Sequence, residues 1–221
     1  MDHREANGES IWHDRTEFGN SSYAGDAWND FPELEELFRE ELGDFLTTFY
    51  QTHYKIFYGT LYRSERIDDR IGSQMWHSDS GPGTCINILY YLQETTPEDG
   101  PLEVLEWNKS LELFILEKKL WFKGKLDSYG DTKRDQISNW YTERINAEGQ
   151  GLVHQPCGPA GLVVPFLNNT IHRGGYPATG RNRTALVFHC YPSHKPTNLS
   201  RYKVTGISKV APYCKDPSAD F

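Results

Sequence analysis

A histidine and an aspartate two residues apart are joined, almost a hundred residues later, by a second histidine that suits the same metal ion. His77 and Asp79 lie in the stretch Gln74–Ser80, and His172 follows the apolar run 161–167. Side chains alternate across a strand, so positions i and i+2 point the same way and can bind one ion. Two histidines and one carboxylate form the facial triad of non-haem Fe(II) sites. We therefore predict His77, Asp79 and His172 as metal ligands and catalytic residues, which requires a fold that brings two distant strand ends together.

The segments around these residues have the composition of strands, rich in aromatic, β-branched and other apolar residues. The expected strands cover residues 55–63, 85–92, 102–105, 151–154, 161–167 and 183–191. The chain has 221 residues, with no internal repeat and no second composition block, which favours one domain. Short strands with glycine and proline turns predict a mainly β fold with flanking helices, as a β-sandwich or a jelly-roll barrel.

Helices are expected in two places. Apolar residues recur every three or four positions over 34–49, which predicts one packing helix that starts near Pro32 and could kink at Gly43. Residues 107–148 interrupt the strands, and we expect helices there through 111–120 and 136–145. This helical insert is a candidate substrate lid. Residues 1–30 are polar and without a period, so we expect a loosely ordered arm.

Composition excludes several classes of function. The formal net charge is −8, which argues against a general nucleic-acid partner. No apolar run reaches the length of a membrane span, and the first residues lack the apolar core of a signal peptide. The four cysteines form no Cys-x-x-Cys pair, so reduced, buried thiols in a cytoplasmic protein are the expectation.

The insert is also rich in basic residues, and two interpretations stay open. It could be a docking patch for an anionic or carrier-tethered substrate, or an ordinary exposed surface. The basic residues are Lys118, Lys119, Lys123, Lys125, Lys133 and Arg134.

Arg183 begins a predicted strand eleven residues after His172. A guanidinium group is always charged and pairs with a carboxylate through two hydrogen bonds, which suits the far carboxylate of 2-oxoglutarate. Arg181 is the competitor at this spacing. Strand alternation favours Arg183, because Ala185 and Val187 then point inward with it. The alternative role for Arg183 is a surface salt bridge.

Asn87 is a second candidate for binding 2-oxoglutarate. It alternates with Leu89 and Tyr91 onto one face of its strand, and that face is expected to line the pocket of the co-substrate. Trp76, beside the triad, is either a wall of the substrate pocket or a core residue.

Taken in order, these motifs resemble the phytanoyl-CoA dioxygenase superfamily of Fe(II)/2-oxoglutarate oxygenases. The resemblance covers roughly residues 55–195 and rests on His77-Ser78-Asp79, Thr95–Leu102, His172 and Gly180–Leu186. It implies a double-stranded β-helix core of the cupin-like kind, iron bound by the triad, 2-oxoglutarate anchored by Arg183 and an insert that shapes the substrate pocket. Many members continue with Pro-Gly-Ser-His after the Gly-Pro-Leu strand, where this chain reads Leu-Glu-Trp-Asn-Lys-Ser over 105–110.

The predicted function is an Fe(II)- and 2-oxoglutarate-dependent dioxygenase. O2 would oxidise 2-oxoglutarate to succinate and CO2 while an unactivated C–H bond of a small-molecule substrate is hydroxylated; desaturation and ring closure stay open. Two alternatives remain: an oxygenase acting on a carrier- or protein-bound group, and a non-catalytic cupin-like metal-binding barrel. Arg183 separates the last from the others, because a metal-binding barrel needs no carboxylate anchor. The substrate and the oligomeric state do not follow from the sequence.

Overall fold

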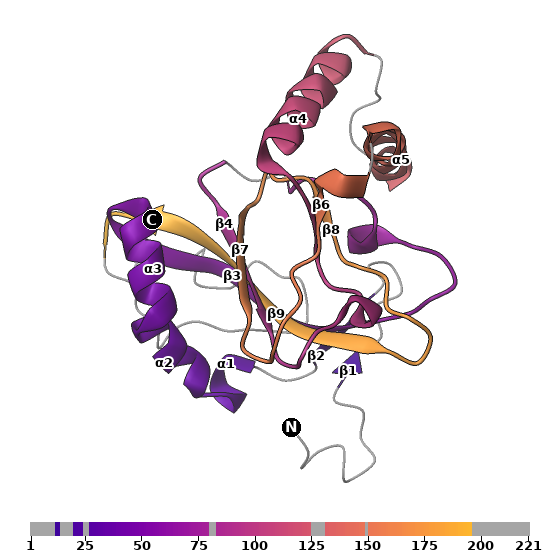
Figure 1. Cartoon of the computed structure of the whole chain (residues 1–221). Helices are drawn as coiled ribbons and strands as arrows, with labels where there is room; N and C mark the ends of the chain where they lie inside the picture. The colour runs from indigo at the N-terminus through magenta and orange to yellow at the C-terminus, as the bar shows by residue number, and fades with distance from the viewer. Residues whose placement is uncertain are drawn as a thin grey trace.

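Two antiparallel sheets lie on opposite sides of a shared interior (Figure 1). The computed structural model describes residues 12–13, 20–23, 27–79, 83–124, 131–148 and 150–195. The larger sheet has the strand order β1-β2-β3-β9-β4-β7, and the smaller has the order β6-β5-β8. The order places β3, from the first third of the chain, beside β9, from its last part.

The strands of the larger sheet are β1 Trp12–His13, β2 Asn20–Tyr23, β3 His53–Glu65, β4 Ile86–Tyr91, β7 Val163–Leu167 and β9 Asn182–Ser193. Those of the smaller sheet are β5 Glu103–Leu105, β6 Val153–His154 and β8 His172–Arg173. The helices are α1 Ala27–Asp30, α2 Glu33–Arg39, α3 Glu41–Tyr50, α4 Trp107–Phe122 and α5 Asp131–Glu148. Short 3-10 turns occupy Gly72–Gln74, Pro97–Asp99 and Gln150–Leu152. All six predicted strands are present, although residues 151–152 of the expected strand 151–154 belong to a 3-10 turn.

The two faces of the larger sheet bury different sets of side chains. On β4, Ile86 and Ile88 pack with the helices α1–α3 on the outer face. Leu89 and Tyr91, together with Ala185 of β9, form a second cluster that reaches Leu102 and the smaller sheet. The alternation expected for β4 and β9 is therefore confirmed, and it makes the space between the sheets the place for inward polar residues.

The helix predicted over 34–49 is two helices, and this prediction was wrong in its continuity. α2 ends and α3 begins at Glu40, whose backbone angles (φ −107°, ψ −99°) are not helical. A Cβ on Gly43 would lie 2.2 Å from the carbonyl oxygen of Phe38, so a glycine is needed for the two helices to approach so closely. The break redirects α3, and Phe45 and Phe49, expected in the buried stripe, are exposed.

The helices of the insert are both present and pack on the outer side of the smaller sheet. Leu113 of α4 and Tyr141 of α5 join Trp76, Leu105 and Ile171 in one buried cluster. Tyr141 donates a hydrogen bond to the Glu117 carboxylate, which joins the two helices to each other. Within the described ranges, no helix combines the length and apolar character needed to cross a bilayer.

The loosely ordered arm expected over residues 1–30 stays a prediction, and its described pieces include two short strands at the edge of the larger sheet. β2 pairs with β3, from Asn20 opposite Ser64 to Ser22 opposite Tyr62, and β1 pairs with β2. Asn20 also accepts a hydrogen bond from the Ser64 hydroxyl and donates one to Ser73. The polar side chains that suggested a loose arm supply these contacts to the sheet edge.

Three cysteines are described and all three are free thiols, but they differ in exposure. Cys85 and Cys190 are buried, whereas Cys157 is exposed, so the expectation of buried thiols was wrong for Cys157; Cys214 lies outside the described residues. Burial raises the pKa of Cys85 to about 11 and that of Cys190 well above its ordinary value.

Native alkylation is therefore expected to modify Cys157 and to spare Cys85 and Cys190, because a buried thiol with a raised pKa offers little thiolate. Iodoacetamide treatment followed by peptide mass spectrometry measures this. A denatured sample, in which the buried pair also reacts, is the control. Labelling of Cys85 in the native protein to the extent seen for Cys157 would contradict the packing described.

Candidate metal centre

The three predicted ligands come from two segments that the fold brings together. His77 and His172 face each other in an antiparallel bridge, in which each backbone N–H donates to the carbonyl of the other at 2.9 Å. The backbone N–H of Asp79 donates to the carbonyl of Asn168 at 2.8 Å. Backbone hydrogen bonds thus fix the relative positions of all three residues, and the side chains need only point the same way.

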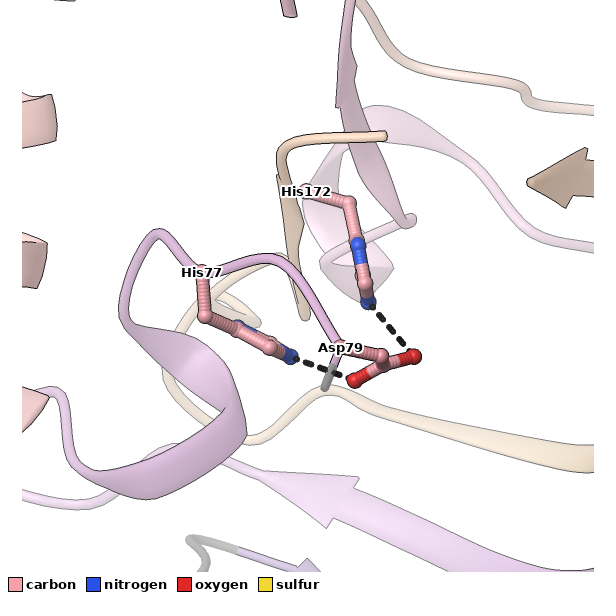
Figure 2. A group of neighbouring side chains, drawn as sticks. All are labelled: His77, Asp79 and His172. Atoms are coloured by element: carbon pink, nitrogen blue, oxygen red, sulfur yellow. Dashed lines mark ion pairs between the residues drawn. The ribbon is translucent and has the colours of Figure 1, made fainter. Parts of the chain in front are cut away.

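The side chains do point toward one another (Figure 2). Both imidazole rings direct their Nε2 atoms at the carboxylate of Asp79. The Nε2 of His77 lies 3.7 Å from Oδ1, and the Nε2 of His172 lies 3.9 Å from Oδ2. One potential ligand atom from each residue lies within 4.8 Å of the others. The structure brings together the complete predicted set.

In each imidazole ring, the hydrogen bond made by Nδ1 leaves Nε2 as the nitrogen available to a metal. Nδ1 of His77 lies 2.7 Å from the carbonyl oxygen of Met75, and Nδ1 of His172 lies 2.8 Å from that of Thr170. A carbonyl accepts only, so each Nδ1 donates its N–H there, and each Nε2 is the ring nitrogen turned toward the carboxylate and available to a metal. Such outer hydrogen bonds commonly orient metal-binding histidines.

Asn87 contacts the carboxylate ligand directly. Its Nδ2 donates to Oδ2 of Asp79 at 2.7 Å. Burial by itself raises the pKa of Asp79, but nearby imidazoles, led by His172, together with the Asn87 amide hold that pKa below its ordinary value. The carboxylate is therefore ionised at neutral pH and oriented for coordination. The sequence predicted that Asn87 lies on the inward face of β4, but not this contact.

Alanine in place of Asn87 is expected to weaken binding of a divalent metal by about 10- to 100-fold, the usual effect of losing a hydrogen bond to a ligand. Calorimetric titration with Ni²⁺ or Co²⁺ under reducing conditions measures it. Asn108→Ala, which removes an exposed amide from α4, is the matched control. Equal affinity of Asn87→Ala and the wild type would show that this hydrogen bond does not support the site.

The residues present fit a six-coordinate ion. Adjacent ligands on an octahedral ion with bonds of about 2.1 Å lie about 3 Å apart. The separations of 3.7 and 3.9 Å are less than 1 Å wider, so small side-chain adjustments would close them. Two imidazole nitrogens and one carboxylate oxygen on one side are the donor set of non-haem Fe(II) sites, with the opposite positions left for other molecules.

Arg183 lies in the interior, as predicted, and it lacks a complete set of partners. Its side chain is 1% exposed, and its Nε and Nη1 have no hydrogen-bond partner among the described residues. Nη2 donates a long hydrogen bond, 3.4 Å, to the Tyr62 hydroxyl. A Cβ on Gly174 would lie 3.6 Å from Nη2, and Gly174 is two residues beyond His172. A buried cation therefore lies close to β8, the strand that carries His172, and its N–H donors can bind an anion.

Arg181 is at the surface. Its side chain is 52% exposed and pairs with Asp99 at 2.8 Å. Arg181 and Arg183 are two residues apart, so alternation alone would give them the same face. Arg181 is at the surface because it precedes β9, which begins at Asn182.

His189, interpreted as a core histidine, lies on β9 opposite Asn87 and is not one of the three grouped ligands. Burial lowers its pKa, although the charge of Asp79 opposes this effect.

Trp76 proves to be a core residue that is 2% exposed. It packs in the cluster beneath α4 and α5, and the guanidinium of Arg173 lies over its ring at 4.4 Å. The insert is therefore anchored on the residues that flank the metal ligands, and its role as a lid stays a prediction. Of its basic residues, Lys118 pairs with Glu117; the side chains of Lys125, Lys133 and Arg134 lie outside the described residues.

No protein-family model and no curated protein sequence matches the chain. Solved structures do resemble it. The non-haem α-ketoglutarate-dependent carbocyclase SnoK from nogalamycin biosynthesis superposes with a TM-score of 0.55 at 16% identity, over 91% of this chain and 78% of its own. HygX from Streptomyces hygroscopicus, with nickel and 2-oxoglutarate bound, gives 0.53 at 14% identity, over 87% and 78%. The epimerase SnoN, also from nogalamycin biosynthesis, gives 0.52 at 14% identity, over 86% and 72%. The chain shares the fold of these enzymes, while membership of the phytanoyl-CoA dioxygenase superfamily stays a prediction.

Proposed function

We propose that this chain is an Fe(II)- and 2-oxoglutarate-dependent oxygenase built on a double-stranded β-helix. The observation that carries the proposal is Arg183, a buried guanidinium with two unpartnered nitrogens beside the strand of His172. A buried cation without a partner is costly, and an anionic ligand removes that cost. The far carboxylate of 2-oxoglutarate is such a ligand, and its other end would reach the metal.

A barrel that only binds metal is the rival function. Such a protein needs the triad but has no use for a buried cation beside it. Tyr62 and Tyr91 also place their rings against the guanidinium of Arg183, with centroids 5.7 and 5.8 Å from its central carbon. These contacts stabilise the position of the charge without neutralising it, which favours a site prepared for a dicarboxylate.

Each residue has a defined task in this proposal. His77 and His172 would hold the iron through Nε2 and Asp79 through its carboxylate, and Asn87 would keep that carboxylate in place. Iron bound there would supply the activation of O2. Arg183 would orient 2-oxoglutarate, so that its 2-oxo acid end faces the metal. The apolar residues around Leu89 and Tyr91 would limit the access of water.

The reaction proposed is the hydroxylation of a C–H bond. 2-Oxoglutarate, O2 and R–H give succinate, CO2 and R–OH, so that one oxygen atom enters succinate and the other enters the product. The structural neighbours include an enzyme named an epimerase and one named a carbocyclase, so this fold serves other outcomes as well. Hydroxylation is proposed because it changes only one C–H bond of the substrate. Desaturation and ring closure each require a second bond of the substrate to react as well.

A small molecule is the proposed substrate. Of the basic residues that suggested a docking patch and whose side chains are described, Lys118 pairs with Glu117. This pair reduces the charge available to a carrier-bound anionic group, which was the ground for that alternative.

The test is succinate formation. Protein purified without oxygen is loaded with Fe(II) and 2-oxoglutarate, O2 is admitted, and succinate is measured by chromatography for the wild type and for Asp79→Ala. We expect slow succinate release by the wild type even without substrate, and none above background by the variant. Equal release by both proteins would mean that the succinate does not come from this site.

A further inference from the structure

Helix α4 exposes five of its large apolar side chains, while two polar residues are buried with Leu113. Toward the smaller sheet and α5 it buries Ser110, Leu113 and Glu117. The outer stripe, as we name the exposed set, consists of Trp107 (40% exposed), Leu111 (37%), Ile115 (44%), Trp121 (38%) and Phe122 (80%). An amphipathic helix on a protein surface has the opposite arrangement, so these residues indicate a partner that the described part of the chain does not supply.

The orientation of α4 is fixed by hydrogen bonds on its polar side. The Ser110 hydroxyl donates to the carbonyl of Leu105 and accepts the backbone N–H of Ile171. Glu117 accepts the Tyr141 hydroxyl. All of these groups are buried, so turning the helix to hide the outer stripe would leave them unsatisfied. The stripe is therefore a stable feature of the surface.

The outer stripe is long and narrow. At 100° per residue its members fall within a sector of about 120°, and the 16 residues from Trp107 to Phe122 extend about 22 Å at a rise of about 1.5 Å per step. Figure 1 shows α4 projecting away from the two sheets at the top of the molecule. A single small substrate would not cover this length, whereas another helix would.

The charges beside the stripe are arranged so that the helix complements itself. Glu106 and Glu112 lie in or next to its N-terminal half, and Lys119 and Lys123 lie in or next to its C-terminal half. Lys118 falls within the sector of the stripe itself, about midway between Leu111 and Trp107 around the helix. Two copies of α4 packed antiparallel about an axis near Ile115 would place Glu112 of one beside Lys119 of the other. The same axis would place Trp107 opposite Phe122 and would also oppose the helix dipoles.

We propose that α4 is the interface of a homodimer, in which the outer stripes of two copies pack against each other antiparallel. Five partly exposed large side chains offer on the order of 100 Å² each, so the interface would bury about 1,000 Å² in total. That area meets the lower limit for a specific interface. The proposal concerns a surface outside the metal ligands and does not depend on the proposed reaction.

The first measurement is the mass of the full chain in solution, by light scattering or sedimentation. The wild type is expected at twice the 25.5 kDa of the chain. Ile115→Glu is expected at the mass of one chain, because two carboxylates would meet at the axis. Phe49→Glu changes an exposed aromatic residue of α3, 49% exposed, and should stay dimeric. Circular dichroism checks that both variants are folded.

The second measurement tests the antiparallel arrangement. Glu112→Lys and Lys119→Glu are each expected to weaken the dimer, since each places like charges together. The double variant should restore the association of the wild type, because the pair is then exchanged rather than broken. Non-specific hydrophobic association would not be restored by exchanging the two charges.

A monomeric wild type would overturn the proposal, as would a dimer that survives Ile115→Glu or is lost in Phe49→Glu. Failure of the double variant to recover would overturn the antiparallel arrangement. If the wild type is monomeric but binds vesicles of anionic lipid and Ile115→Glu does not, the outer stripe belongs to a membrane surface and the dimer is refuted.

Discussion

Alanine in place of Asp79 is expected to weaken binding of Fe(II) by more than about 100-fold. Loss of a hydrogen bond to a metal ligand costs up to about 100-fold, and loss of the ligand itself should cost more. Asp79 would contribute the single anionic ligand of the site, and its carboxylate lies between the two imidazoles at 3.7 and 3.9 Å. Its pKa is held below the ordinary value, so the wild-type ligand is charged at neutral pH. The variant keeps two neutral nitrogen ligands that hold a divalent ion weakly.

The measurement is anaerobic titration with Fe(II), with Ni²⁺ as an oxygen-stable substitute. Asp44→Ala removes an exposed carboxylate from α3 and is expected to bind metal as the wild type does. The metal-free Asp79→Ala protein should fold but be somewhat less stable than the wild type at neutral pH, because the lowered pKa of Asp79 shows that the folded state stabilises its charged carboxylate. Metal binding of wild-type strength in Asp79→Ala would remove this residue from the site.

Methionine in place of Arg183 is expected to weaken binding of 2-oxoglutarate to the metal-loaded protein by about 30- to 5,000-fold, since truncating one partner of a buried charge pair costs about 2–5 kcal/mol. The same change should leave the ligand-free protein as stable as the wild type or more so. Methionine occupies a similar volume and removes a buried cation whose Nε and Nη1 have no partner. These opposite effects on binding and stability distinguish an anchor from a structural residue.

Arg181→Met is the matched control, because Arg181 lies two residues away on the same segment and pairs with Asp99 at the surface. We expect its affinity for 2-oxoglutarate to equal that of the wild type. Calorimetry with the nickel-loaded proteins gives the affinities, and thermal unfolding without ligand gives the stabilities. Loss of affinity in Arg181→Met with retention in Arg183→Met would exchange the roles of the two arginines.

Local rules predicted the parts of the fold that depend on alternation. The inward face of β4 and β9 follows from the period of two, and it placed Arg183 inside together with Ala185. Arg181 precedes β9 and pairs with Asp99 at the surface. The triad was predictable for the same reason, since His77 and Asp79 are two residues apart on one segment. The pairing with His172 rested on chemistry and not on any local pattern.

Features that depend on long-range contacts escaped prediction. The break at Glu40 arises because α3 packs closely on the end of α2 through Gly43, a contact that a periodic apolar pattern does not reveal. The hydrogen bond between Asn87 and Asp79 needs the loop after His77 to return over β4. The two-residue strand β8 is too short for a sequence signal.

Helix α4 shows a third kind of limit. The periodicity of its apolar residues predicts a helix but does not tell which face is buried. An apolar residue such as Leu113 would be expected on the buried face, and polar residues would be expected on the exposed one. The structure buries Glu117 and Ser110 with it because Tyr141 and the backbone of Ile171 supply partners. Tertiary hydrogen bonds thus decide the orientation and leave Ile115 in solvent.

The central claim is that the triad and Arg183 bind a metal and 2-oxoglutarate in one site. The most direct measurement adds 2-oxoglutarate to the anaerobic, Fe(II)-loaded protein and records the visible absorption spectrum. The account predicts a metal-to-ligand charge-transfer band in the wild type, a band that needs far more 2-oxoglutarate in Arg183→Met, and none in Asp79→Ala. If the wild type holds iron but develops no band at any concentration of 2-oxoglutarate, the claim is wrong and a metal-binding barrel takes its place.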